Sequence, residues 1–184
     1  MTKVAIIVGS LRKNSFSQRW ADNLASFLPD GYKAFFPKIG SLPLYNEDYD
    51  ADESQTPEEY KNFRNEMKEA DAVIFVTPEY NRSLPAVTKN ALDVGSRPYG
   101  ESIWDGRPAM VVSHSISQIG GALSNHSLRQ NLVFLNMPIL QQPELYLANS
   151  GDIMDDDGKI TGEGTEDFLK EAVASFVDFV EKLI

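Results

Sequence analysis

The sequence predicts an α/β fold in which helices cover both faces of a five-stranded parallel sheet, the three-layer, doubly wound arrangement. Two observations carry this prediction. Apolar runs without polar alternation recur along the chain, as is typical of strands buried on both faces, and segments with helical spacing alternate with these runs. No long linker and no internal repeat interrupts the pattern, so we expect a single domain over residues 1–184.

The predicted strands are, in chain order, KVAIIVG (3–9), YKAFF (32–36), DAVIFVT (71–77), RPAMVVSHS (107–115) and PELYLA (143–148). The predicted helices cover residues 16–28, 58–70, 86–94, 123–135 and 168–183. Apolar residues every three or four positions define the buried stripe of the first, second and last of these helices. Leu-Pro-Asp-Gly at 28–31 ends the first helix, Thr56 and Pro57 start the second, and Gly120 and Gly121 form a turn before the fourth.

Five such units predict the strand order 2-1-3-4-5. In sheets of this type ligands bind beyond the carboxyl ends of the strands, near the switch point between strands 1 and 3. The loops after strands 1, 3 and 4 are therefore expected to converge on one site.

Composition excludes several kinds of site. The chain has no cysteine, which rules out disulfides, iron–sulfur clusters, cysteine–zinc sites and thiol nucleophiles. Its net charge of −10 disfavours nucleic acid or an anionic membrane as a partner, and either keeps the protein soluble or attracts cationic redox partners. No apolar run approaches the roughly 20 residues that span a bilayer, so no membrane insertion is expected. The short apolar run at the N-terminus predicts a strand rather than a signal peptide.

The loop GSLRKNSFS, residues 9–17, follows the first strand and opens a helix, where unpaired N–H groups and the helix dipole favour an anion. It matches neither the Walker loop nor the dinucleotide fingerprint. With Gly9 as its one glycine, a terminal phosphate fits better than a diphosphate, and the guanidinium of Arg12 suits a phosphate dianion. The alternative is an ordinary polar loop with a serine N-cap.

The loop TPEYNRSLP, residues 77–85, follows the third strand and contains two prolines that stiffen it. Backbone amides here suit a heteroaromatic ring, and Tyr80 supplies a flat face. The alternatives are that Tyr80 is an aromatic at the rim and Glu79 a solvated acid, neither of which needs a ligand.

Together, GSLRKNSFS and TPEYNRSLPAVTKNALD resemble the NADPH-dependent FMN reductases of flavodoxin-like fold, which include bacterial quinone, chromate and azo-dye reductases. The resemblance extends to IGGALSNHSLRQNLVFLNMPILQQPE and so covers nearly the whole chain. It implies that the first loop binds the FMN phosphate through Ser10, Arg12, Ser15 and Ser17. It implies that the second loop contacts the isoalloxazine through Pro78, Glu79, Tyr80 and Asn81. It also implies that the loop after strand 4 contacts the ring, with Ser115 as the candidate residue.

The resemblance also implies a two-step reaction. NADPH, or NADH in its place, reduces the flavin and leaves, and a small-molecule acceptor such as a quinone, an azo compound, chromate or free flavin then takes the electrons. The flavin performs the chemistry, so no catalytic side chain and no metal ligand is assigned. A cytoplasmic homodimer or homotetramer is expected, with the helices near KNALDVGSRP and LRQNLVFL in its interfaces. Two alternatives remain: a flavodoxin-type FMN electron carrier without its own substrate, and a flavin-binding sensor or scaffold.

Three features depart from the family pattern or stay open. Ser117 stands where relatives often have glycine. Arg82 is an unexpected cation that either attracts the NADPH 2′-phosphate, raises the flavin potential or is simply solvated. His114 either donates a proton to a reduced acceptor or is a structural histidine. The acidic cluster at 152–157 fails the EF-hand pattern and predicts a solvated turn.

Overall fold

The computed structural model describes all residues of the chain, 1–184, and contains one five-stranded parallel sheet. Its strands are β1 (Thr2–Val8), β2 (Tyr32–Phe35), β3 (Ala72–Pro78), β4 (Ala109–His114) and β5 (Leu145–Leu147). They are hydrogen-bonded in the order β2-β1-β3-β4-β5, all in parallel, which confirms the predicted topology. β3 and β4 are buried along their whole length, as their unbroken apolar runs predict.

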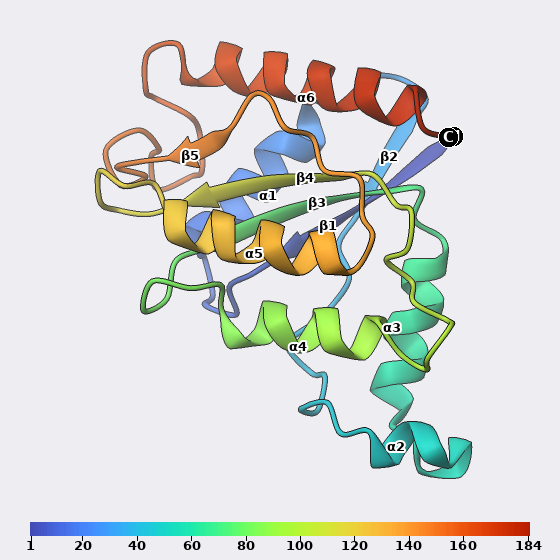
Figure 1. Cartoon of the computed structure of the whole chain (residues 1–184). Coiled ribbons are helices and arrows are strands. Elements are labelled where there is room, and N and C mark those ends of the chain that lie inside the picture. Colours follow the sequence, from blue (N-terminus) through green and yellow to red (C-terminus); the bar gives the residue numbers. More distant parts are fainter.

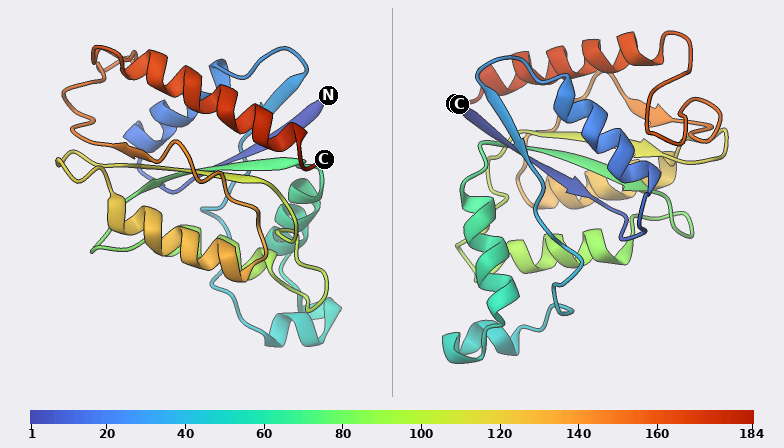
Figure 2. Two further views of the ribbon diagram at one scale, coloured as in Figure 1. Left: turned by 45° about the horizontal axis from the view of Figure 1, so that its top comes forward. Right: turned by 180° about the vertical axis from the view of Figure 1, so that it is seen from behind.

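Helices cover both faces of the sheet (Figure 1). The helices are α1 (Phe16–Ser26), α2 (Asp48–Ala51), α3 (Glu58–Lys68), α4 (Ala86–Gly95), α5 (Ala122–Phe134) and α6 (Thr165–Glu181). α1 and α6 lie on one face, and α3, α4 and α5 lie on the other (Figures 1 and 2). Each face has its own core cluster; Trp20, Leu24 and Phe176 belong to the first, and Phe63, Trp104 and Leu128 to the second.

The long polar segment after β2 contains more structure than its composition predicts. It forms the short helix α2 and a 3-10 turn at Glu53–Gln55, which protrude below α3 and α4 in Figure 1. Asp50 of α2 pairs with Arg64 of α3 at 2.8 Å, and both side chains are 9% exposed. The ring of Tyr60 packs against Tyr45 and Tyr49 of the same segment. The segment is thus held in place by contacts with α3. It has no apolar periodicity, so the sequence gives no sign of its helix.

Two details of the helices differ from the prediction. The N-cap of α3 is Pro57 and not Thr56, whose hydroxyl instead donates to the carbonyl of Tyr49 at 2.6 Å. Phe168 of α6 and Leu183, which lies beyond the last residue of that helix, are 37% and 47% exposed, although the periodicity places both with its buried residues. Phe168 lies near the start of α6, and the helix ends at Glu181, before Leu183.

The predicted turn before α5 is present, with Gly120 and Gly121 at φ values of 63° and 74°. This left-handed region is costly for residues with a Cβ. A Cβ at Gly121 would also come within 2.9 Å of the carbonyl oxygen of His114. The two glycines therefore let the chain turn tightly at the end of β4 and begin α5 next to it.

None of the helices combines the length and the apolar character that a bilayer crossing requires.

Candidate functional site

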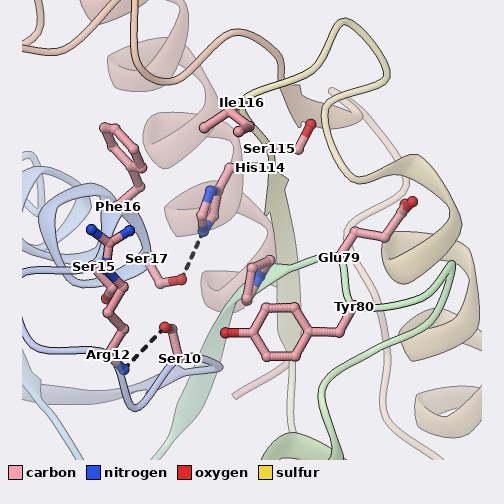
Figure 3. Close-up of a pocket in the computed structure, with 11 residues that line it drawn as sticks. Ser10, Arg12, Ser15, Phe16, Ser17, Glu79, Tyr80, His114, Ser115 and Ile116 are labelled. Atoms are coloured by element: carbon pink, nitrogen blue, oxygen red, sulfur yellow. Dashed lines mark hydrogen bonds between the residues drawn. The ribbon is translucent and has the colours of Figure 1, made fainter.

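A cavity of about 210 Å³ lies at the carboxyl edge of the sheet, between the loops that follow β1, β3 and β4. Figure 3 shows the side chains that surround it. Its lining residues are Ser10, Arg12, Ser15, Phe16, Ser17, Pro78, Glu79, Tyr80, His114, Ser115 and Ile116. The three loops expected from the strand order to converge thus meet at this point.

The first loop presents donors that the protein itself does not use. Ser15 is the N-cap of α1, and its hydroxyl oxygen accepts from the N–H of Gln18 at 3.1 Å. The hydroxyl oxygen of Ser10 accepts from the N–H of Arg12 at 3.3 Å. In both serines the hydroxyl hydrogen is left for another acceptor. The backbone N–H groups of Phe16 and Ser17 have no partner, as expected in the first turn of a helix.

Arg12 is exposed at the edge of the cavity, and its guanidinium makes no hydrogen bond or ion pair within the chain. Figure 3 shows its side chain beside Ser15 and Phe16. Together with the positive end of α1, this free cation makes the loop a suitable site for an anion.

Gly9 is required for packing at the base of this loop. A Cβ there would lie 2.9 Å from Oγ1 of Thr88 and 3.2 Å from the carbonyl oxygen of Val76. The N–H of Gly9 donates to that same carbonyl at 2.8 Å, so the backbone cannot move away without losing the bond. The single glycine of the loop therefore allows β1, β3 and α4 to approach closely.

Ser17 and His114 form a buried pair at the floor of the cavity. Oγ of Ser17 lies 2.7 Å from Nε2 of His114, and the two residues are 0% and 5% exposed. Burial penalises the charged imidazolium and lowers the pKa of His114 from 6.5 to about 4. The ring is therefore neutral at pH 7, which favours the structural alternative over the one in which His114 donates a proton to a reduced acceptor.

The second loop is held by a tight turn. Tyr80 and Ser83 exchange two backbone hydrogen bonds of 3.0 Å, and the residues between them, Asn81 and Arg82, have φ values of 51° and 65°. Positive φ at both central positions is the signature of a type I′ hairpin turn, in which asparagine is common and arginine is not. The turn directs the ring of Tyr80 toward Ser10 across the cavity (Figure 3).

Glu79 is tied to α5 and is not a solvated acid. Its Oε2 accepts from the N–H groups of Leu123 and Ser124 at 3.0 and 3.3 Å, and its side chain is 11% exposed. Its Oε1 pairs with the exposed guanidinium of Arg82 at 3.3 Å. A carboxylate at the first turn of α5 satisfies free N–H groups and the helix dipole together.

The third loop, after β4, is ordered by its own serines. The hydroxyl oxygen of Ser115 accepts from the N–H of Ser117 at 3.1 Å, and the two hydroxyl oxygens lie 2.9 Å apart. Ser117 does not have positive φ, so no glycine is needed at its position.

Of the predicted site residues, only Asn81 does not line the cavity; it lies in the turn beyond Tyr80. Three lining residues were not assigned to the site: Phe16, His114 and Ile116. The periodicity of α1 counts Phe16 as a core residue, and an apolar residue in a polar loop, such as Ile116, carries no chemical signal. The position of His114 at the end of β4 was a usable signal, but proximity alone does not establish a role.

The acidic cluster forms a turn, as expected. Met154 and Ile160 pair across it, and Oδ1 of Asp155 accepts from the N–H groups of Asp157 and Lys159 at 3.0 and 2.8 Å. This carboxylate is thus occupied by the backbone of its own loop.

Comparison with known proteins gives one consistent result. A quinone reductase of Pseudomonas putida is 49% identical over 178 residues, which cover 97% of this chain and 94% of that protein. A 2-hydroxy-1,4-benzoquinone reductase of a Burkholderia species is 40% identical over 97% of this chain and 96% of its own length. The structure of a flavoenzyme NAD(P)H:(acceptor) oxidoreductase from Paracoccus denitrificans superposes with a TM-score of 0.91 at 37% identity, covering 100% of this chain and 99% of that one.

The sequence profile of one family matches residues 2–152, which include all three loops of the cavity. The chain belongs to the NADPH-dependent FMN reductase family, as its two loop motifs indicate, and is an oxidoreductase of flavodoxin-like fold.

Proposed function

We propose that this protein is an FMN-dependent oxidoreductase that takes hydride from NADPH, or from NADH, and reduces quinones. The observation that carries the proposal is the cavity at the switch point of the sheet, with a free arginine and free helix N–H groups on one side. The names of relatives at 49% and 40% identity, a quinone reductase and a 2-hydroxy-1,4-benzoquinone reductase, support the choice of acceptor.

The residues present suit a phosphate monoester at the first loop. Arg12 would neutralise its charge, and Ser10 and Ser15 each have a hydroxyl hydrogen to donate. The N–H groups of Phe16 and Ser17 add the positive end of α1. The first loop contains no acidic side chain, and the carboxylate of Glu79 in the second loop is directed to α5 and not to the anion.

The size of the cavity suits a ligand that remains partly accessible. At about 210 Å³ it is smaller than the roughly 300–1,000 Å³ of pockets that enclose a small molecule. A mononucleotide held at the first loop therefore extends past the cavity, toward Tyr80 and Ile116, which are 50% and 75% exposed. A second substrate can approach from this open side.

Bound FMN supplies the redox chemistry, accepting hydride from a reduced nicotinamide and passing electrons to an acceptor. The chain's own residues position the cofactor and set its surroundings. The type I′ turn and the Glu79 anchor fix the backbone of residues 78–83, and the N–H groups of this loop that the turn does not use are the predicted partners of the ring. His114 is neutral and buried, so it places no charge beneath the ligand at neutral pH.

We propose further that donor and acceptor use the same open side in turn, which gives ping-pong kinetics. Azo compounds, chromate and free flavin are included as acceptors on the same grounds, since an open site selects weakly by shape. A cytoplasmic location belongs to the proposal, because a cysteine-free chain that uses a reduced nicotinamide suits a reducing compartment.

A titration and a steady-state assay test this function. The purified protein is reconstituted with FMN, and its absorbance is followed under anaerobic conditions as NADPH and then a benzoquinone are added. We expect bleaching with NADPH alone, recovery with the quinone, and parallel double-reciprocal plots. Protein that binds FMN but is not bleached by NADPH or NADH is an electron carrier instead, and protein that binds no FMN contradicts the cofactor assignment.

We propose that the protein assembles with a second copy through the carboxyl-terminal ends of α4 and α5. Val133 and Phe134, at the end of α5, are 70% and 89% exposed, and Tyr99, in the segment after α4, is 91% exposed. Tyr99 and Phe134 also line a groove of about 560 Å³. Clustered exposed apolar side chains are typical of interaction surfaces, and a self-complementary patch gives a closed dimer.

A further inference from the structure

The family resemblance places Ser17 in the phosphate loop but gives no role to its buried contact with His114. Both residues line the cavity, and Oγ of Ser17 has no hydrogen-bonding partner other than Nε2 of His114. The other ring nitrogen, Nδ1, is buried without any partner in the protein. An unpaired buried polar atom costs free energy, so its presence beside a ligand cavity needs an explanation.

The two tautomers of the neutral ring give this pair opposite properties. If Nδ1 carries the hydrogen, Nε2 accepts from the Ser17 hydroxyl, and the hydroxyl has nothing left to donate. If Nε2 carries the hydrogen, it donates to Oγ of Ser17, and the hydroxyl hydrogen is free to point into the cavity. The second tautomer also leaves Nδ1 as an unpaired acceptor rather than an unpaired N–H, which is the less unfavourable of the two.

A phosphate in the cavity distinguishes between these tautomers, because the oxygens of a phosphate dianion accept hydrogen bonds and have no hydrogen to donate. Ser17 belongs to the first turn of α1, next to the free N–H groups and Ser15. Because Nε2 of His114 lies 2.7 Å from Oγ, the Ser17 hydroxyl can donate toward this anion only if Nε2 carries the hydrogen and donates to Oγ. His114 is the one side chain placed to give that support.

We propose that His114 is a positioning residue for the phosphate end of the cofactor: its Nε2–H holds the Ser17 hydroxyl so that this hydroxyl donates to a phosphate oxygen. The inference rests on the proposed binding of FMN at the first loop. It gives Ser17 a geometric role within the predicted phosphate site and explains why a histidine ends β4.

The distance of 2.7 Å also resembles that of a serine nucleophile and its histidine base. Two observations exclude this use. No third group orients the ring, since Nδ1 is unpartnered. Burial also keeps the pKa of His114 near 4, which makes it a poor base at neutral pH.

The first test compares FMN with riboflavin, which lacks the phosphate. His114→Phe removes the donor and keeps a planar ring, and His114→Gln restores a donor near the position of Nε2. Affinities of the apoproteins are measured by quenching of flavin fluorescence. We expect His114→Phe to weaken FMN binding about tenfold, to leave riboflavin binding unchanged, and to be rescued largely by His114→Gln.

A second pair of measurements shows whether the effect passes through Ser17. In a Ser17→Ala background, His114→Phe should cause no further loss of FMN affinity, since the hydroxyl that it positions is gone. In the wild-type protein with FMN bound, two-bond ¹⁵N–¹H spectra should show the hydrogen of His114 on Nε2. His126→Gln assigns the spectra, because the chain has 2 histidines.

The outcomes separate the inference from the proposed function. If wild-type protein binds FMN, but His114→Phe weakens FMN and riboflavin equally or the hydrogen lies on Nδ1 in the complex, the positioning role is overturned while the function stands. If wild-type protein binds neither flavin, the proposed function itself fails. The spectra need no variant of His114, so they decide the question even if His114→Phe does not fold.

Discussion

The carboxylate of Glu79, at the end of β3, accepts hydrogen bonds from the backbone of Leu123 in α5 at 3.0 Å. One side chain thereby joins the loop after β3 to α5, the helix that follows the loop after β4. The first prediction concerns this contact. Glu79→Ala should lower the free energy of unfolding by about 1–2 kcal/mol, the usual cost of losing a helix cap with its charge.

Glu79→Gln keeps an acceptor oxygen and should lose less, and Arg82→Ala removes only the exposed ion pair and should change stability by less than about 1 kcal/mol. Urea unfolding of the three variants at equal ionic strength measures this order. An equal loss in all three would show that Glu79 does not anchor α5.

Arg12→Ala should release the cofactor from a folded protein. The guanidinium has no partner within the chain, so its removal costs little stability, whereas a lost charge-assisted bond to a phosphate weakens binding by about 10- to 100-fold. Equilibrium dialysis against FMN gives the affinity, and circular dichroism monitors the fold. Lys13→Ala is the matched control, since Lys13 is a neighbouring cation outside the cavity lining. Full occupancy in Arg12→Ala would contradict the assignment.

The buried histidine predicts a specific pH dependence of stability. The pKa of His114 is about 4 in the folded protein and about 6.5 when unfolded, so the unfolded chain binds the extra proton between these values. The contribution of the neutral ring to the free energy of unfolding is fully present above pH 6.5. It decreases as the pH falls from 6.5 to about 4, and a further fall in pH reduces it no more. The loss at pH 5 is about 2 kcal/mol.

His114→Gln should remove this component. The difference in unfolding free energy between wild type and variant, measured at pH 7 and at pH 5, isolates it from the carboxylates that titrate in both proteins. A difference that is the same at both pH values would show that His114 is not desolvated.

Gly9→Ala should destabilise the protein by about 1–3 kcal/mol, because the added methyl group overlaps Thr88 and the carbonyl of Val76. Gly151→Ala is the control: its Cβ would meet only Phe16, at 3.9 Å, and its backbone does not have positive φ. Thermal unfolding of the apoproteins compares them without the cofactor. Equal stability of the two variants would refute the packing role of Gly9.

Phe134→Asp should convert the proposed dimer into a monomer by placing a charge in its apolar interface. Phe168→Asp alters a partly exposed phenylalanine on α6, on the opposite face of the sheet, and should leave the mass unchanged. Sedimentation equilibrium measures the mass of each. A dimeric Phe134→Asp variant would place the interface elsewhere.

Several features follow from the sequence alone because they depend on local patterns. The unbroken apolar run at 72–76 predicts a strand buried on both faces, and Ser15 before an amphipathic segment predicts a helix start. Alternation of such units restricts the sheet to a few topologies, of which the order 2-1-3-4-5 is the one observed. That order brings the loops after β1, β3 and β4 together, so the composition of the site was predictable before its geometry.

The tertiary structure decided what each side chain at that site does. Glu79 had the sequence signature of a solvated acid or a flavin contact, and only the packing of α5 beside β3 makes it a helix cap. Ser17 and His114 are 97 positions apart, and no local pattern relates them. Likewise, α2 depends on a buried ion pair from α3. Hydrogen bonds and ion pairs between distant residues leave no periodicity in the sequence, because they are set by where the sheet places each chain segment.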